Sequence, residues 1–567
     1  MANVYGIDLG TTYSCIAKCN ENGDIETLKQ LYANDETSLP SVVSFNDDGT
    51  PIVGRDAKKR LRNDKYSERT IDNFKREMGK TYCSQKILVG TCKRQISPIE
   101  ASACVLHELI SVIPRKKGEK IPAVIAIPTG YTNHEKQFVK NAAKFAGIEV
   151  LGLIQEPTAA AIRSNIQSGE TALVFDLGGG TLDVSVVQNE GGKYKVKGFA
   201  SDKEFLKDKS GVPQNIGGID WDDALIELAC QQMMWSRDDF NKAQLGLFKE
   251  YAEDCKMELS KFDNTGTLAV GEITNIKNPT ESIPIYNKDF IIRSNVLLEE
   301  CVTVVNGAID KADHENGDPI PIDYCVMAGG SSNLKMIKSR LSTALAERIG
   351  KDRQEDEWLR SLDHTERAIA EGAALRAYRL INNQDDQIDF VEEKSRYSYG
   401  TSIEFRRNGS AERVRLIRNL ILSNDEMVFE NERPFKFTAE NDSITVDVYE
   451  NGSSAYYNEV VGKGIMKPVK ITREGREIID SNPIEEAQPI HYASIFHETI
   501  QVRPKVDESG IKYVDFYVSR DKDGIIKIVV EDSNGRRDPQ EVMPNVNENI
   551  VNKIKESIKK MDKARGM

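Results

Sequence analysis

Apolar residues over roughly the first 380 positions follow two spacings, which predict strands alternating with helices. Short β-branched runs at 123–127 and 322–327 predict buried strands. Between such runs, apolar residues recur every three or four positions, and this spacing predicts helices over 98–113, 132–147, 221–234, 245–259, 334–349 and 366–380. Strands and helices that alternate along a chain define the α/β class.

A different pattern begins after the polar segment 382–387. From about residue 397 to residue 530, short stretches alternate apolar and polar positions between turn residues, as at 443–449, 513–518 and 525–530. This part therefore predicts an all-β domain. The final segment, 546–567, predicts one amphipathic helix, and we expect the basic residues at its end to face solvent.

Two distant segments share one pattern. Residues 4–17 and 172–187 each run from an apolar strand into an aspartate, through a glycine-containing turn with threonine, and out along an alternating strand. The aspartates are Asp8 and Asp176, and the turns read DLGTT and DLGGGT. A hairpin repeated at this separation predicts two similar lobes that face each other across a cleft.

The two turns have the chemistry of a phosphate site. Glycine lets backbone N–H groups approach an anion closely, so two facing turns can hold a polyphosphate from both sides. Asp8 and Asp176 would repel phosphate unless a divalent cation lay between them, and magnesium bound partly through water fits this role. The GKT sequence at 79–81 resembles the end of a Walker phosphate loop, but Phe74 stands where that motif needs its first glycine, so we expect a plain loop there.

Composition and charge exclude several classes of protein. The 567 residues are 39% apolar and 29% charged, which excludes collagenous, disordered and coiled-coil proteins. The net charge of −13 argues against nucleic acid as the main partner. We expect no membrane partner, because the sequence has no run of about 18 apolar residues and no signal peptide. Nine scattered cysteines, and histidines without zinc-site spacing, predict a cytoplasmic protein with neither disulfides nor zinc.

The order of short motifs is similar to that of one family. The first 380 residues contain GIDLGTTYSC (6–15), NFKREMG (73–79), IPTGYTN (127–133), IQEPTAAAI (154–162), VFDLGGGTLDVSV (174–186), GGIDWD (217–222), CKMELS (255–260), MAGGSSNL (327–334) and AEGAALRA (370–377). With these motifs the chain resembles the seventy-kilodalton heat-shock protein family, the DnaK-type chaperones, within the actin and sugar-kinase superfamily. A weaker similarity continues through SYGTSIE (398–404), SITVDVYEN (443–451) and VDFYVSRDKDGIIKIVVED (514–532).

The resemblance implies a domain organisation. An α/β, actin-like, two-lobed ATPase domain would occupy 1–383, an interdomain linker 384–394, and an all-β sandwich that binds peptides 395–541. A short C-terminal helix at 542–567 stands where the family has a helical lid. We therefore expect a divergent member whose lid is absent or truncated, and which exchanges peptides rapidly.

The resemblance also assigns roles around the cleft. Lys75 would meet the γ-phosphate and Glu156 would lie near the attacking water, with Asp176 and Thr181 completing the catalytic set. Asp8 and Asp176 would hold Mg²⁺ through water, while Asp183, together with Thr181 and Tyr13, matches positions that bind K⁺ in the family. The remaining implied contacts are to ATP or ADP, from Gly10, Thr11, Thr12, Tyr13, Gly178, Gly179, Gly180, Gly217, Gly218, Glu253, Lys256, Ser260, Gly329, Gly330, Ser331, Asn333 and Glu366.

Communication between the domains and peptide binding also have candidate residues. Ile388, Phe390 and Val391 would replace the leucine run of the family's linker. The relay between domains is implied at Pro128 and Lys136, and the peptide groove at Phe437 and Ile444.

Two positions depart from the family at the nucleobase. Asn333 stands where the family commonly has an arginine stacked on adenine, and Met257 stands where many members place a second cation. Loss of a cation over an aromatic base weakens stacking. We therefore expect a weaker purine affinity, or one that depends more on the phosphates.

The function implied by the resemblance is that of an ATP-dependent molecular chaperone, active in protein folding and the stress response. ATP hydrolysis would control binding and release of unfolded peptide segments, with a J-domain co-chaperone and a nucleotide-exchange factor as partners. Two alternatives remain open from the sequence: a small-metabolite kinase on the same fold, and an ATP-binding scaffold, similar to exchange factors, with little hydrolysis.

Overall fold

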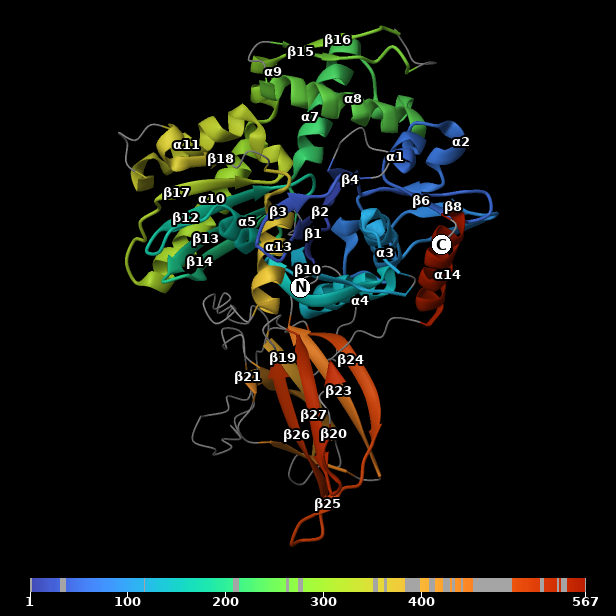
Figure 1. The fold of residues 1–567 in the computed structure, drawn as a ribbon, viewed down its shortest axis with the longest axis vertical. Coiled ribbons are helices and arrows are strands. Elements are labelled where there is room, and N and C mark those ends of the chain that lie inside the picture. Colours follow the sequence, from blue (N-terminus) through green and yellow to red (C-terminus); the bar gives the residue numbers. More distant parts are fainter. Residues whose placement is uncertain are drawn as a thin grey trace. The chain divides into compact units, whose positions relative to one another are not determined.

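The computed structural model of the chain forms two compact units. The first contains Met1–Gly130, Val139–Val391 and Glu548–Met567, and the second contains Tyr131–Phe138 and Glu392–Asn547. The structure describes residues 3–30, 37–116, 118–207, 214–261, 265–273, 279–349, 355–361, 365–382, 398–406, 413–421, 429–430, 434–439, 442–451, 492–520, 525–537, 540–541 and 548–565. Figure 1 labels the elements of both units.

The first repeated hairpin lies inside a mixed sheet of the first unit. This sheet has the order β11 (Ile148–Gln155), β10 (Ile121–Ile127), β1 (Val4–Asp8), β2 (Tyr13–Cys19) and β3 (Ile25–Thr27), and β4 (Ser38–Pro40) also pairs with β2. β1 is parallel to β10 and antiparallel to β2. Asp8 is the last residue of β1, so its carboxylate stands at the turn between β1 and β2.

The second hairpin has the same place in a second sheet. The order is β14 (Lys193–Ser201), β13 (Leu182–Glu190), β12 (Thr171–Leu177), β17 (Tyr324–Ala328) and β18 (Leu359–Ser361). β12 is antiparallel to β13 and parallel to β17, just as β1 is to β2 and β10. Asp176 lies near the end of β12, so the sequence repeat corresponds to a structural repeat.

Helices and small sheets complete the first unit. The helices are α1 (Arg55–Leu61), α2 (Asp64–Ser67), α3 (Pro98–Leu109), α4 (Asn133–Ala146), which begins in the second unit, α5 (Glu156–Arg163), α6 (Asp202–Phe205), α7 (Gly218–Met233), α8 (Lys242–Lys261), α9 (Asn287–Arg293), α10 (Asn295–Asn316), α11 (Lys335–Ile349), α12 (Glu355–Trp358), α13 (Ala368–Ile381) and α14 (Glu548–Ala564). The small sheets pair β5 (Val43–Phe45) with β6 (Pro51–Val53) and β7 (Thr70–Ile71), β8 (Lys86–Val89) with β9 (Cys92–Gln95), and β15 (Thr265–Leu268) with β16 (Ile283–Tyr286).

Each helix predicted from apolar spacing is present, with ends shifted by a few residues. Proline in the first turn starts α3 and α5, where its missing N–H costs no helical hydrogen bond.

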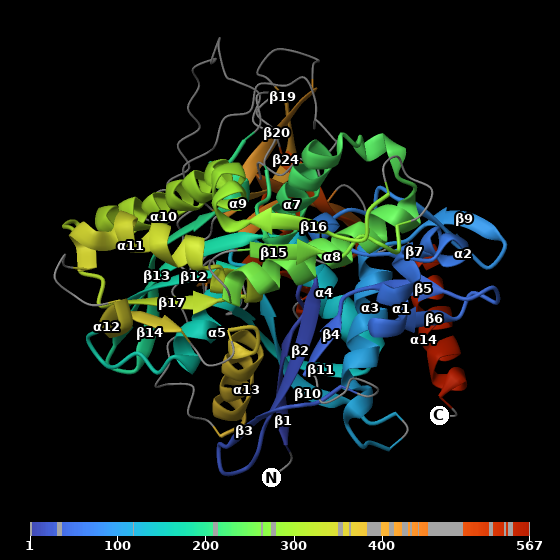
Figure 2. The ribbon, with the colours of Figure 1, turned by 90° about the horizontal axis from the view of Figure 1, so that it is seen from above.

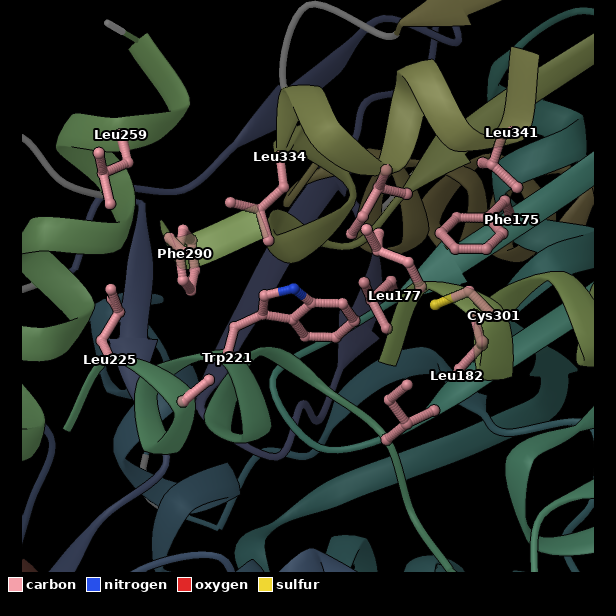
Figure 3. Close-up of a cluster of buried hydrophobic side chains, with 14 of the residues drawn as sticks. Phe175, Leu177, Leu182, Trp221, Leu225, Leu259, Phe290, Cys301, Leu334 and Leu341 are labelled. Atoms are coloured by element: carbon pink, nitrogen blue, oxygen red, sulfur yellow. The ribbon is translucent and has the colours of Figure 1, made fainter. Parts of the chain in front are cut away.

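α13 joins the two large sheets. Its alanines pack in one apolar cluster with residues of β1, β2, β10, β12 and β17, and Figure 2 shows α13 between the sheets. Small residues permit this approach: a Cβ on Gly6 would lie 2.0 Å from the backbone nitrogen of Ala374. A second cluster surrounds Trp221, which is fully buried among residues such as Phe175 and Phe290 (Figure 3). These cores fix both hairpins to one rigid frame.

The second unit is built of strands, as its alternating pattern predicts. One sheet has the order β20 (Arg413–Ile421), β19 (Ser398–Arg406), β23 (Ser443–Asn451) and β24 (Tyr492–Gln501). The other joins β21 (Phe429–Glu430), β22 (Phe435–Thr438), β25 (Lys505–Val506), β26 (Lys512–Arg520), β27 (Ile526–Asp532), β28 (Gly535–Arg536) and β29 (Gln540–Glu541). Residues of both sheets, among them Val446 and Phe516, form one core.

α14 corrects one expectation from the sequence. It belongs to the first unit and packs on α3, and two basic residues of the segment 546–567 do not simply face solvent. Lys560 Nζ donates to the backbone oxygen of Asp48 at 3.0 Å, and Arg565 pairs with Glu108. Charge alone does not distinguish a solvated basic face from one that meets acidic partners far away in the sequence. Within the described ranges, no helix is long and apolar enough to cross a membrane.

Candidate functional site

A cleft of 680 Å³ opens where the two hairpins meet in the first unit. Its wall includes most of the residues predicted from the sequence: Asp8, Gly10, Thr11, Thr12, Tyr13, Lys75, Glu156, Asp176, Gly178, Gly179, Thr181, Gly218, Glu253, Lys256, Ser260, Gly329, Gly330, Ser331, Asn333 and Glu366. These residues come from segments up to about 360 positions apart, and the fold brings them to one cavity.

Glycines allow the hairpin turns to approach each other. A Cβ on Gly179 would lie 1.8 Å from Thr12 Oγ1, and a Cβ on Gly180 would lie 2.6 Å from Thr11 Cγ2. Gly217 packs behind the second turn, where a Cβ would lie 2.5 Å from the Cα of Gly180. Gly180 and Gly217 are therefore needed for the close packing of the turns, although neither is part of the cleft wall.

A buried cluster of charged groups lies in the cleft. Lys75, in the short 3₁₀ helix Phe74–Glu77, donates from Nζ to Glu156 Oε1 at 2.8 Å. Only 8% of the Lys75 side chain and 7% of the Glu156 side chain are exposed. Asp8 and Asp176 are also buried. One ammonium group thus faces three carboxyl groups.

This excess of acid changes the protonation of the aspartates. Burial raises the pKa of Asp8 to about 7, with repulsion from Glu156 adding to the effect and Lys75 opposing it. Burial, and then repulsion from Glu156, Asp183 and Asp8, raises the pKa of Asp176 well above its usual range. Burial acts to lower the pKa of Lys75, but attraction to Glu156 and Asp8 outweighs it and raises that pKa. Such a cluster favours binding of a further cation.

The donor set of the cleft is of the kind that magnesium uses. Asp8 and Asp176 supply hard carboxylate oxygens next to a cradle of backbone N–H groups, and Mg²⁺ usually keeps several waters and takes only one or two carboxylates. Among the described residues, no group of three or more His, Cys, Asp or Glu side chains is arranged to hold a metal ion. For K⁺, Asp183 is buried and pairs in register with Asp176, while Thr181 and Tyr13 lie in the cleft wall.

A polar network connects α8 to the first hairpin. Lys58, on α1, donates from Nζ to the Tyr13 hydroxyl at 2.7 Å and to Glu253 Oε2 at 2.5 Å. Burial acts to lower the pKa of Lys58, but Glu253 and Tyr13 raise it overall. The sequence analysis missed Lys58, because it lies in a run of basic residues typical of an exposed helix face.

Lys256 has its own partners one turn further along α8. Its Nζ lies 2.7 Å from Asp222 Oδ1 and donates to the Gly218 carbonyl at 3.0 Å. Burial raises the pKa of Asp222 to about 6, with Lys256 opposing the shift. Arg76, also missed, donates from Nε to the Gly180 carbonyl at 3.0 Å and from Nη2 to Asp220 Oδ2 at 3.1 Å. In the motif that contains both residues, the resemblance assigns a phosphate contact to Lys75 and no role to Arg76.

The predicted nucleobase residues line the cleft without a guanidinium among them. Asn333 Nδ2 donates to Thr365 Oγ1 at 2.8 Å, and Ser260 Oγ donates to the backbone oxygen of Lys256 at 2.8 Å. Met257 is 50% exposed and contributes a thioether to the wall. Among the described residues, the cations in the cleft wall are Lys75 and Lys256, both buried and both paired with carboxylates.

Other predicted residues lie away from the cleft. Lys80 of the GKT sequence pairs with Glu77 at 2.9 Å and is not part of the cleft wall, as expected for a plain loop. Pro128 follows β10 and is buried, and Lys136 is buried in the first turn of α4. Phe437 lies in β22, whereas Ile444 is 6% exposed within the core of the second unit and offers little surface to a peptide. Ile388, Phe390 and Val391 lie outside the described residues.

Two repeated strand–aspartate–turn–strand units lie around this glycine-lined cleft, and facing turns of this kind are typical of proteins that bind phosphate groups. The sequence model of the Hsp70 protein family matches residues 4–463. The chain belongs to the Hsp70 family, which confirms the resemblance drawn from its motifs. Hsp70 proteins combine an actin-like ATPase domain with a β-sandwich, and both α/β and all-β parts are present here.

Curated relatives agree with the family assignment. The chain is 31% identical over 421 residues to the chaperone protein DnaK of one strain of Thermus thermophilus, and the alignment covers 68% of this chain. It is 30% identical over 421 residues to the chaperone protein DnaK of a second strain of the same organism, again with 68% of this chain covered. In both cases the match spans 62% of the relative's length.

Proposed function

We propose that this chain is an ATP-dependent molecular chaperone, in which hydrolysis of ATP in the cleft controls binding of unfolded peptide segments by the β-sandwich unit. The observation that carries the proposal is the buried pair of Lys75 and Glu156, next to Asp8 and Asp176, between two glycine turns. Phosphoryl transfer to water needs positioning and electrostatic stabilisation more than covalent chemistry, and these residues can supply both.

Each group in the cluster has a distinct task. Lys75 would move from Glu156 to the γ-phosphate, where its ammonium group would stabilise the charge that develops during transfer. Glu156, freed from that pair, would orient the attacking water, and Thr181 would donate to the phosphate from the second turn. A magnesium ion held through water by Asp8 and Asp176 would neutralise phosphate charge.

The rest of the nucleotide would lie toward α8. Glu253 and Lys256 stand one turn apart on one face of this helix, as expected for groups that hold a ribose. Asn333 and Met257 would leave the base without a stacked cation, so the affinity would depend mainly on the phosphates.

Communication between hydrolysis and peptide binding would use the segment after β10. Residues Tyr131–Phe138 group with the second unit, while the chain on both sides of them belongs to the first. Within the second unit, Asn133 N donates to Glu450 at 3.2 Å, and the backbone N–H of Ile526 donates to Asn133 Oδ1 at 3.2 Å. Pro128 and Lys136 at this segment, and Ile388, Phe390 and Val391 in the linker, are the residues proposed to carry the signal.

The family suggests the partners. Unfolded or extended peptides, a J-domain co-chaperone and a nucleotide-exchange factor are proposed, in a cytoplasmic setting. Peptide binding is assigned to the β-sandwich unit, with the groove proposed at Phe437 and at Ile444, although Ile444 is buried.

Single-turnover ATP hydrolysis, with and without an unfolded peptide, tests the proposal. A chaperone should hydrolyse ATP slowly and be stimulated by the peptide. A metabolite kinase would respond to a small hydroxyl-bearing substrate instead, and a scaffold would bind ATP without releasing phosphate. A Thr181→Ala variant should slow hydrolysis mildly, so a peptide-stimulated rate that is insensitive to this change would place the chemistry elsewhere.

A further inference from the structure

The helix that carries Lys75 cannot hold its position by itself. It is a single 3₁₀ turn, Phe74–Glu77, and so few residues form too few hydrogen bonds to offset the cost of ordering them. Phe74 is buried, and Asn73, just before the helix, has a left-handed φ of 53°, which persists where the surrounding structure imposes it. Contacts with the rest of the fold therefore decide where this helix lies relative to the phosphate turns.

Some of these contacts are local and others reach the far side of the cleft. Glu77 accepts a hydrogen bond from the backbone N–H of Ser84 at 2.9 Å, within the loop that follows the helix. Lys75 reaches Glu156, at the start of α5, and Arg76 reaches the second turn. Under the proposed function Lys75 leaves Glu156 when a nucleotide binds. The contact of Arg76 does not depend on that step, so it can hold the helix while Lys75 moves.

Arg76 binds two acceptors with one guanidinium group. Its Nε donates to the carbonyl oxygen of Gly180 at 3.0 Å, and its Nη2 donates to Asp220 Oδ2 at 3.1 Å. The same Oδ2 accepts from the backbone N–H of Gly217, just before α7, at 2.6 Å. Glycine at position 180 leaves room for the guanidinium, because a Cβ there would lie 2.8 Å from Nε. One planar group thus fixes both the second turn and the start of α7.

The carbonyl groups of the second turn are all held by donors. Those of Gly178 and Gly179 accept from the first two backbone N–H groups of α7, each at 2.9 Å. The carbonyl of Gly180 accepts from Arg76 instead. A side chain therefore completes what α7 does for the other two peptide units.

The direction of a carbonyl also sets the direction of the next N–H. A trans peptide unit is planar, and its C=O and N–H bonds point in opposite directions. With the Gly180 carbonyl turned toward Arg76, the N–H of Thr181 in the same peptide unit points away from Arg76. Thr181 is part of the cleft wall, whereas Arg76 and Gly180 are not. The contact of Arg76 thus directs one backbone donor of the turn toward the cleft.

We propose that Arg76 is a positioning residue for phosphoryl transfer, which holds the Thr181 N–H and the helix of Lys75 in one arrangement around the terminal phosphate of ATP. The inference rests on the proposed function, because it assigns a task within that ATPase site. Arg76 touches neither the phosphate nor the attacking water in this role. It acts through the peptide unit 180–181 and through Lys75, its neighbour in the chain.

The geometry of the guanidinium matters more than its charge. The side chains of Arg76 and Asp220 are 22% and 27% exposed, so solvent screens their attraction. A lysine at position 76 would keep the positive charge, but its single ammonium group lacks the rigid fork that holds a carbonyl and a carboxylate together. We therefore expect Arg76→Lys to be slowed to nearly the same extent as Arg76→Ala.

Single-turnover hydrolysis and nucleotide affinity of the full chain test the proposal together. For Arg76→Ala we expect hydrolysis to slow by roughly 10- to 100-fold, while the Kd for ADP changes by less than about threefold. The affinity for ATP should fall more than that for ADP, because the contacts that are lost lie at the terminal phosphate. Arg237→Ala is the matched control: Arg237 pairs with Asp223 on the same helix α7 but is not part of the cleft wall, so native values are expected.

Three results would overturn the proposal: an Arg76→Ala variant that hydrolyses bound ATP at the native rate, equal losses of affinity for ATP and ADP, or an Arg76→Lys variant with full activity. Equal losses would show that Arg76 only supports the fold of the turn. Thermal melts check folding. If Arg76→Ala unfolds, Asp220→Asn carries the test, because it keeps an oxygen for the Gly217 N–H and weakens the hold on Arg76; a smaller loss in the same direction is expected.

Failure of the proposed function would look different, because the native chain itself would then release no phosphate. In that case the ratio of ATP affinity to ADP affinity decides. This ratio should fall toward one in Arg76→Ala, and a ratio that equals that of the native chain would overturn the inference.

Discussion

The ammonium of Lys75 lies 2.8 Å from the carboxylate of Glu156 in a buried part of the cleft, so each residue neutralises the other when no phosphate is present. A pair of this kind is poor evidence for stability, because desolvation of both ions offsets their attraction. Under the proposed function, the pair would separate when a nucleotide binds, and Lys75 would then meet the terminal phosphate.

Lys75→Ala should separate catalysis from binding. We expect hydrolysis in a single turnover to fall by about 10²–10³-fold, as for other lost electrostatic groups, while the Kd for ATP changes by less than about tenfold. Phosphate release and isothermal calorimetry measure the two effects. Lys80→Ala is the control, because Lys80 follows the 3₁₀ helix that contains Lys75 but pairs with Glu77. Equal losses of affinity and rate would mean that Lys75 only binds.

The acid cluster predicts an unusual pH dependence of stability without nucleotide. The pKa of Asp8, raised to about 7 in the folded protein, lies above its unfolded value, so the folded state binds the extra proton between about pH 4 and 7. The contribution of Asp8 to the free energy of unfolding is therefore lowest above about pH 7. It rises as the pH falls from about 7 to about 4, by up to about 1.4 kcal/mol per pH unit. Thermal melts of the native chain and Asp8→Asn, compared at each pH, isolate the effect.

Magnesium should reverse that dependence. A divalent cation competes with the proton on Asp8, so Mg-ATP should stabilise the protein more at about pH 8 than at pH 6. Removal of the metal with a chelator should abolish the difference. An Asp8→Asn variant that retains the full pH-dependent gain would show that Asp8 does not hold the ion.

Lys58→Ala should accelerate nucleotide release. Lys58 joins Tyr13 of the first hairpin to Glu253 of α8, and its loss leaves the half-buried carboxylate of Glu253 without the cation that it pairs with at 2.5 Å. A hydrogen bond to a charged group contributes about 1.5–3 kcal/mol, so we expect release roughly tenfold faster or more. Stopped-flow displacement of a fluorescent ADP measures it. Lys59→Ala is the matched control, because Lys59 is exposed and pairs with Asp56, at 3.4 Å, rather than with a residue of the cleft.

Much of the site could be predicted because its chemistry is local. The turns after Asp8 and Asp176 contain the glycines, and a repeated local pattern predicts a repeated local structure. The repeat also predicts two facing lobes, and therefore that the two turns meet. In the structure Gly179 of the second turn lies close to Thr12 of the first.

The residues that the sequence does not reveal owe their roles to contacts with residues far away along the chain. Lys58 and Glu253 are 195 positions apart, and Arg76 and Asp220 are 144 apart. Nothing in the neighbouring sequence distinguishes Lys58 from Lys59, although Lys58 is half-buried and bonded to Tyr13 and Glu253 while Lys59 is exposed. The position of α1 against α8 decides between them, and this is a property of tertiary packing.

Asn333→Arg should raise the affinity for ATP. Asn333 lines the cleft and donates to Thr365, so the base end lacks a guanidinium that could stack on a purine. A cation over an aromatic ring contributes about 0.5–2 kcal/mol, so the Kd should fall roughly two- to thirtyfold. The hydrolysis rate of bound ATP should not change, because Asn333 makes no contact with the Lys75 and Glu156 pair. Asn333→Gln adds length without charge and should leave the affinity unimproved. If the arginine variant binds ATP no more tightly while inorganic triphosphate affinity is also unchanged, the purine does not lie against this part of the cleft.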